Sequence, residues 1–183
     1  MCLSGSKAKK TGASAKKKPK KKAGKSTAKC ANKAECPLSD KKKKAIVAKL
    51  KESGKADDIA KGINDGKIKM YEMNDDVRKK YKEGKDTIAL KVGDKIFIDP
   101  KTNDALAATH TAHEGTHVLD KTPNKTKADK LRREMKAFNK EADVWEALKK
   151  KNPKLKDQQE DLIVKMKKDG TLEDAVKRSY GIP

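Results

Sequence analysis

The sequence predicts an α+β fold: a mostly helical domain with a small antiparallel sheet, preceded by a disordered basic arm. Three observations lead to this prediction. Residues 87–99 alternate apolar and polar side chains around a Gly-Asp pair, as a β-hairpin does. Residues 126–150 repeat apolar side chains at the helical period, whereas residues 1–38 are rich in lysine and have no apolar period. We therefore divide the chain into an arm over residues 1–38 and one domain over residues 39–183.

The arm carries most of the excess positive charge. Residues 1–44 hold 16 lysines against Glu35 and Asp40, in a chain whose net charge is +21. Such a segment is typical either of a solubilising tail or of electrostatic contact with nucleic acid or another polyanion. All the aromatic residues follow residue 70, so base stacking by the arm is not supported and the packed core is expected after it.

The sequence also bears on the compartment. No apolar run approaches the length of a membrane span, and the N-terminus lacks the apolar stretch of a signal peptide. We therefore expect a protein that is cytoplasmic or is secreted by a leaderless route. Cys30 and Cys36 could form a disulfide in an oxidising compartment or remain free thiols, and the sequence does not decide between these.

The elements before the central motif are predicted from caps and alternation. Ser39 and Gly54 bound the first helix, and Gly93-Asp94 is the expected turn of the hairpin. The expected elements are helices over about 40–53 and 56–63, a strand over 67–71, a helical turn or two over 75–82 and the hairpin over 87–99.

Helices make up the rest of the chain. Thr102 or Asn103 can cap a helix over about 103–120, and Thr171-x-x-Asp174 resembles a capping box. The long helix over 126–150 carries one apolar stripe that we expect in the core. Its members are Leu131, Met135, Phe138, Ala142, Trp145 and Leu148. Two more helices are expected over about 156–168 and 172–179.

The pattern His113-Glu114-x-x-His117 falls on the helix over 103–120 and is the HExxH pattern of zinc peptidases. Positions i and i+4 of a helix share one face, so both imidazoles can reach one metal ion. Glu114 projects beside them, where it can take a proton from a water molecule at the metal. The motif therefore predicts a metal site with His113 and His117 as ligands and Glu114 as general base.

Three carboxylates compete to be the third ligand. Asp120 follows His117 by three residues on the same helix, so it is better placed to orient a ligand than to complete the site. Glu134 falls within the apolar stripe of the next helix and Glu141 along its edge. They lie roughly 10 Å apart along the helix axis, so only one of them can reach the metal.

A hairpin, a helix bearing HExxH and a second helix bearing a glutamate resemble the zincin metallopeptidases. Glu134-Met-Lys-Ala137 resembles the E-x-x-A element of the gluzincin branch, which implies that Glu134 is the third ligand. Glu141 would then contact a ligand or lie at the rim of the site. Metzincins are disfavoured, because Asp120 and Pro123 occupy the positions of their conserved glycine and third ligand. The basic arm and small size are also similar to bacterial effector or polymorphic-toxin metallopeptidases.

The resemblance implies one zinc per chain and hydrolysis of a peptide or protein substrate. The substrate would lie along the exposed edge of the 87–99 sheet, and His110, Tyr180 and Arg178 are candidate donors to the oxyanion. An alternative function is a polyanion-binding or nucleic-acid-binding protein in which the metal is structural or the motif vestigial. The oligomeric state and the substrate do not follow from the sequence.

Overall fold

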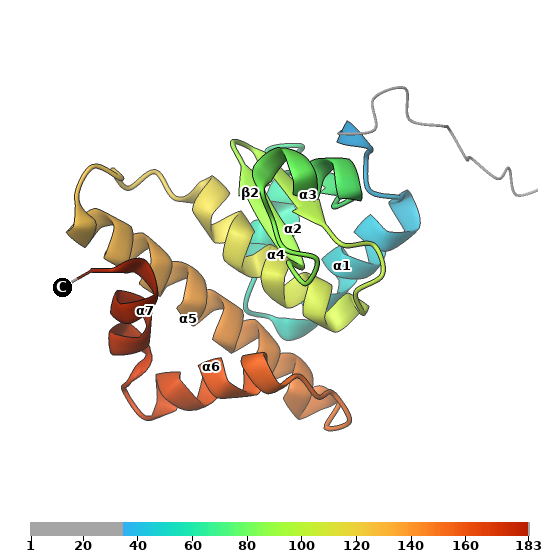
Figure 1. Ribbon diagram of the computed structural model, residues 1–183. Coiled ribbons are helices and arrows are strands. Elements are labelled where there is room, and N and C mark those ends of the chain that lie inside the picture. Colours follow the sequence, from blue (N-terminus) through green and yellow to red (C-terminus); the bar gives the residue numbers. More distant parts are fainter. Residues whose placement is uncertain (1–34, 183) are drawn as a thin grey trace, which may run out of the picture.

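The computed structural model describes residues 35–182, so residues 1–34 of the predicted arm lie outside the described residues. Its elements are α1 (Asp40–Ser53), α2 (Asp57–Asn64), β1 (Lys69–Glu72), α3 (Asp75–Tyr81), β2 (Ala89–Val92), β3 (Lys95–Ile98), α4 (Asp104–Leu119), α5 (Lys127–Lys151), α6 (Gln158–Lys168) and α7 (Leu172–Tyr180). Helix α4 packs against α1, α2 and the sheet on one side and against α5 on the other, and α6 and α7 pack on α5 (Figure 1). The predicted α+β, mostly helical fold is confirmed.

Local side-chain signals place most of the helix ends. Ser39 caps α1 and Gly54 ends it in the left-handed conformation, as predicted. Asn103 rather than Thr102 caps α4, and Thr126 begins α5 with a reciprocal capping box. The capping box predicted at Thr171 is wrong, because this residue has helical backbone angles and its side chain makes no cap hydrogen bond.

The sheet is mixed rather than antiparallel. Strands β2 and β3 form the predicted hairpin, and Gly93 begins its turn with a φ of 63°. The predicted antiparallel sheet is wrong for β1, which pairs in parallel with β3. The chain passes through α3 and β2 between these two strands, and the strand order is β1-β3-β2. This order makes β3 the central strand, and Ile96, Phe97 and Ile98 are all buried on its two faces.

Residues 36–38, which the sequence assigns to the arm, lie along β1. Pro37 forms a bridge with Tyr71, and Leu38 donates a backbone hydrogen bond of 3.0 Å to Met70. The Leu38 side chain is only 4% exposed, so the folded part begins before the expected boundary at residue 39. Cys36 is disulfide-bonded, and the other cysteines of the chain lie outside the described residues.

Besides a small cluster in which Met73, Val77 and Phe97 pack α3 against the sheet, two apolar clusters hold the other helices together. The larger lies between α1, α2, the sheet, α4 and α5, and the four alanines Ala105, Ala107, Ala108 and Ala112 let α4 approach its neighbours closely. The smaller joins α5 to α6 and α7, where Phe138 and Met135 pack against Ile163 and Val176. The predicted stripe of α5 therefore contributes to both clusters and links the two halves of the domain.

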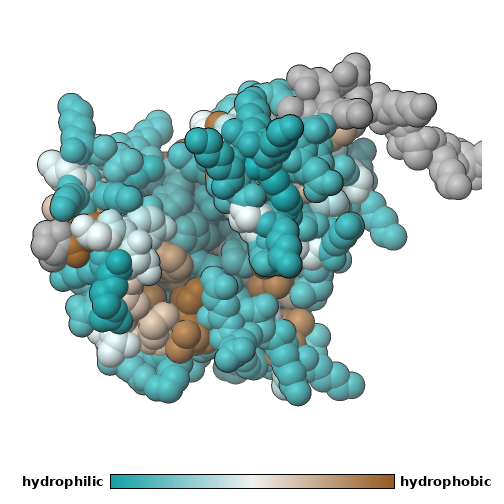
Figure 2. Space-filling model, viewed as in Figure 1, coloured by the Kyte–Doolittle hydropathy of each residue, from teal (hydrophilic) through white to brown (hydrophobic). Residues whose placement is uncertain are grey.

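The molecular surface is mostly hydrophilic on the face drawn in Figure 2, with hydrophobic residues gathered near α6 and α7. Among residues 35–182, no helix combines the length and the apolar content that a membrane crossing requires.

Candidate metal centre

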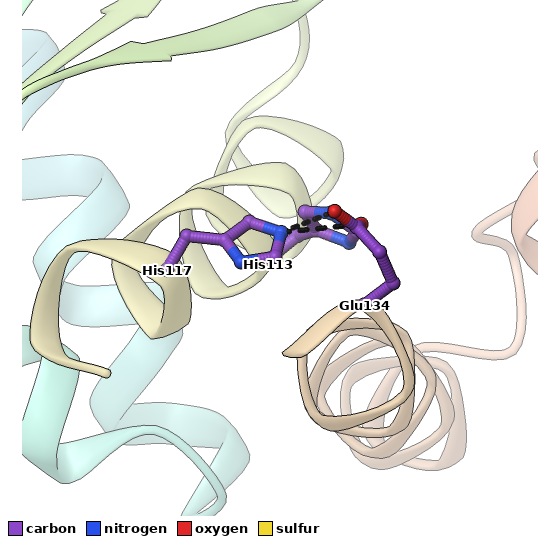
Figure 3. Close-up of side chains that lie close together, drawn as sticks. All are labelled: His113, His117 and Glu134. Carbon is purple, nitrogen blue, oxygen red and sulfur yellow. Dashed lines mark hydrogen bonds and ion pairs between the residues drawn. The ribbon is translucent and has the colours of Figure 1, made fainter. Parts of the chain in front are cut away.

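Helix α4 and helix α5 bring three of the predicted site residues together. His113 and His117 project from one face of α4, and Glu134 projects from α5 towards them (Figure 3). The two Nε2 atoms of the histidines lie 3.2 Å apart. The Glu134 Oε2 atom lies 3.3 Å from Nε2 of His117 and 3.8 Å from Nε2 of His113. The three donor atoms therefore converge on one point between the helices.

This donor set fits a zinc ion. Bonds of about 2.0–2.2 Å in a tetrahedral site place ligand atoms roughly 3.3–3.5 Å apart, close to the observed separations. The Glu134 Oε2 atom is buried and has no hydrogen-bond partner within residues 35–182, as expected of an atom that a cation would satisfy. Burial lowers the pKa of His113, which favours the neutral imidazole that binds metals.

A close approach of two helices sets the position of the motif. Gly115 lies between Glu114 and the second histidine on the side of α4 that faces α2. A Cβ atom there would lie 2.6 Å from Cγ2 of Ile59, so only glycine leaves room for this contact. Gly115 thus lets the helix that carries both histidines pack directly on α2.

Glu141 contacts one of the candidate ligands. Its Oε2 atom lies 2.7 Å from Nδ1 of His113, and its side chain is 3% exposed. A carboxylate at Nδ1 directs Nε2 towards the metal and makes the imidazole a stronger ligand. Asp120, expected to orient a ligand, instead accepts hydrogen bonds of 3.0 and 2.7 Å from the backbone and hydroxyl of Thr122. The carboxylate of Asp120 therefore stabilises the turn after α4.

Glu114 lines a cavity of about 250 Å³ that also contains the three candidate ligands. Burial raises the pKa of Glu114, whereas the charges of His113 and His117 act to lower it. A carboxylate in such an environment is a better proton acceptor than a fully solvated one. The cavity thus combines a candidate general base with a candidate metal site.

The three candidate oxyanion donors lie in different places. Tyr180 lines the cavity, and burial together with the Glu134 carboxylate raises its pKa, which keeps the hydroxyl protonated. Arg178 is exposed on α7 and does not line the cavity. His110 faces away from the cavity towards Glu141 and Glu160. Only Tyr180 is therefore positioned as a donor.

Two basic residues near the site were not predicted from the sequence. Lys91 of β2 and Arg133 of α5 line the cavity. Arg133 donates to the backbone carbonyls of Asp120 and Thr122 at 3.1 and 2.7 Å, and so ties the end of α4 to α5. No local pattern marks these residues, because their roles depend on how α4, α5 and β2 meet.

Glu160 of α6 is a further residue that the sequence analysis missed. It is completely buried beside His110 and Glu141. Burial raises the pKa of Glu141 to about 8, and burial with the charge of Glu141 raises the pKa of Glu160 to about 10. Burial and the neighbouring His113 lower the pKa of His110 to about 4. A second group of ionisable side chains thus lies behind the first.

A scan against protein-family models, a search of curated proteins and a search of solved structures each found no match to this chain.

Proposed function

We propose that this chain is a zinc-dependent metallopeptidase. The observation that carries the proposal is the convergence of His113, His117 and Glu134, with donor atoms 3.2–3.8 Å apart, in one cavity with Glu114. Three protein ligands and an open fourth position are typical of catalytic zinc, whereas structural zinc takes four protein ligands.

The residues around the cavity can divide the chemistry of hydrolysis between them. Zinc bound there would supply Lewis acidity to the attacking water and to the scissile carbonyl. Glu114 would take a proton from that water and pass it to the leaving amine. Tyr180 would donate a hydrogen bond to the carbonyl oxygen as negative charge develops on it. The raised pKa of Tyr180 favours the protonated hydroxyl that its role needs, and the raised pKa of Glu114 makes its carboxylate a stronger proton acceptor.

An extended peptide is the substrate that the surroundings of the cavity suit. Strand β2 lies at the edge of the sheet, and Leu90 and Lys91 of this strand line the cavity. A peptide that pairs with the free edge of β2 would run past Glu114, held by main-chain hydrogen bonds. This geometry favours an unfolded segment or a loop of a protein over a compact folded substrate.

The decisive experiment replaces Glu114 with glutamine. The substitution keeps the size of the side chain but removes the proton acceptor, so cleavage of an unfolded protein should fall by about 100- to 10,000-fold. Bound zinc, measured by elemental analysis, should not change. New peptide N-termini would be counted by mass spectrometry, and a chelator should abolish them in the wild type.

Glu146→Gln is the matched control, because Glu146 is an exposed residue of α5 that pairs with Lys168 at 2.6 Å. This variant should cleave at the wild-type rate. A Glu114→Gln protein with near-normal turnover would exclude the proposed mechanism. Zinc binding without any cleavage by the wild type would instead favour the alternative of a polyanion-binding protein with a structural metal.

A further inference from the structure

A second convergent cluster lies one helical turn before the candidate ligands of α4. His110 of α4, Glu141 of α5 and Glu160 of α6 offer donor atoms that all lie within 4.8 Å of one another. Nδ1 of His110 lies 3.5 Å from Oε1 of Glu141, and Nε2 of His110 lies 3.4 Å from Oε1 of Glu160. Three different helices thus direct one imidazole and two carboxylates to the same place.

Glu160 is the feature that needs an explanation. Its side chain is fully buried, and no donor group among residues 35–182 forms a hydrogen bond to its carboxylate oxygens, which face the carboxyl group of Glu141 and can bond to it only through a shared proton. A buried carboxylate without a partner costs several kcal/mol, so such groups are normally satisfied by a donor or a cation. The next residue shows the usual solution, since Asp161 accepts from Trp145 at 2.8 Å and Lys149 at 2.6 Å.

No basic side chain except histidine compensates the two carboxylates. Within residues 35–182, neither Glu141 nor Glu160 forms an ion pair with a lysine or an arginine, although the chain holds 48 of these residues. Asp157, at the start of α6, adds a further negative charge that acts on His110. The interior of a strongly basic protein therefore contains two carboxyl groups that no lysine or arginine of residues 35–182 pairs with.

A shared proton can join Glu141 and Glu160 in the metal-free protein, but hydrogen bonds do not account for the position of His110. Contacts of 3.4 and 3.5 Å between His110 and the carboxylates exceed the usual N–H···O range of about 2.7–3.2 Å. The two contacts involve different ring nitrogens, so an ion would bind only one of them, together with one carboxylate oxygen from each glutamate, and these three donor atoms lie within 4.8 Å of one another. The donor atoms of His113, His117 and Glu134 at the first site also lie within this distance of one another.

We propose that His110, Glu141 and Glu160 form a second divalent metal site, separate from the site at His113 and His117. The imidazole donor favours zinc or a similar transition-metal ion over Ca²⁺ and Mg²⁺, which prefer oxygen ligands alone. An ion can reach the site from solvent, because His110 also lines a cavity of about 380 Å³ with Gln159 and residues 86–89.

The two sites share Glu141. One oxygen of this residue contacts His113 at 2.7 Å, and the other faces His110. Metal at the second site would fix the Glu141 carboxylate in place and so hold His113 ready for its own ion. This coupling rests on the proposed function, whereas the second site itself does not.

Metal stoichiometry tests the proposal without reference to activity. The full chain is stripped with a chelator, titrated with Zn²⁺ and passed over a desalting column, and zinc per chain is then measured. We expect two zinc ions in the wild type, one in Glu160→Gln and one in Glu134→Ala. The zinc kept by Glu134→Ala should show a single imidazole ligand by X-ray absorption, and an excess of Ca²⁺ should not displace it.

Glu146→Gln, which removes one exposed carboxylate of α5, should retain two ions. His110→Gln provides a second variant, also expected to lose one ion, if circular dichroism shows that Glu160→Gln does not fold. A wild type with one ion that Glu160→Gln retains would overturn the second site. One ion that Glu160→Gln loses but Glu134→Ala retains would support the second site and count against the proposed peptidase centre.

Discussion

Gly115→Ala should destabilise this protein even though alanine is the better helix former. The residue lies inside α4, where alanine would ordinarily stabilise by about 1 kcal/mol relative to glycine. Here the added Cβ would lie 2.6 Å from Cγ2 and 3.1 Å from Cδ1 of Ile59, whose side chain is fully buried. The Cγ2 atom is bonded directly to the branched Cβ, so it cannot move away without a change of rotamer or a shift of α2.

The magnitude follows from two opposing effects. Overpacking of a tight core costs about 1–3 kcal/mol, which exceeds the gain in helix propensity, so we expect a net loss of about 1 kcal/mol. Ile59→Ala alone should cost about 2–5 kcal/mol, because it leaves a cavity. In that background the alanine at position 115 has room. Gly115→Ala should then raise the free energy of unfolding by about 1 kcal/mol, whereas it lowers this free energy in the wild type.

Urea unfolding of the wild type, Gly115→Ala, Ile59→Ala and the double variant measures the effect of Gly115→Ala on the free energy of unfolding in both backgrounds. A chelator in the buffer removes any contribution of bound metal to stability. Gly62→Ala in α2 is the matched control, because its closest contact is the flexible Cδ1 atom of Ile68 at 2.9 Å, and its cost should be smaller. If Gly115→Ala stabilises the wild type as much as it stabilises Ile59→Ala, the contact between α4 and α2 is not as close as described.

Three further results are expected. In metal-free protein the pKa of Glu160 is raised, so the native state binds a proton that the unfolded state releases. The free energy of unfolding should therefore fall by on the order of 1 kcal/mol from pH 7 to 8, as measured by urea titration. Glu160→Gln should remove much of this pH dependence. Glu141→Ala should weaken zinc binding at the first site by about 10- to 100-fold and Glu134→Ala by more, and a zinc titration with the opposite order would reassign the third ligand. Removal of residues 1–34 deletes 12 lysines and no acidic residue, and it also deletes both other cysteines, so the two chains are compared under reducing conditions. Residues 35–183 should then melt near the temperature of the full chain but elute from heparin at lower salt, and unfolding on truncation would show that the arm belongs to the core.

The amino-acid sequence determined the features that depend on near neighbours. Ser39 and Gly54 predicted both ends of α1, because capping needs only hydrogen bonds within one turn. The alternation around Gly93 predicted the hairpin, since a two-residue turn itself brings its strands into register. The i, i+4 spacing placed His113 and His117 on one face of α4 for the same local reason.

The tertiary structure alone decided which distant residues meet. Glu134 and Glu141 share one face of α5, and only the way that α5 packs across α4 directs Glu134 to both Nε2 atoms and Glu141 to Nδ1 of His113. Glu160 had no signal in the sequence, because a glutamate in the first turn of a helix ordinarily faces solvent near the helix N-terminus. The parallel pairing of β1 with β3 was likewise hidden, since strands separated by a helix carry no turn that sets their register. Such contacts depend on how whole faces of helices and strands pack, and no short stretch of sequence records that.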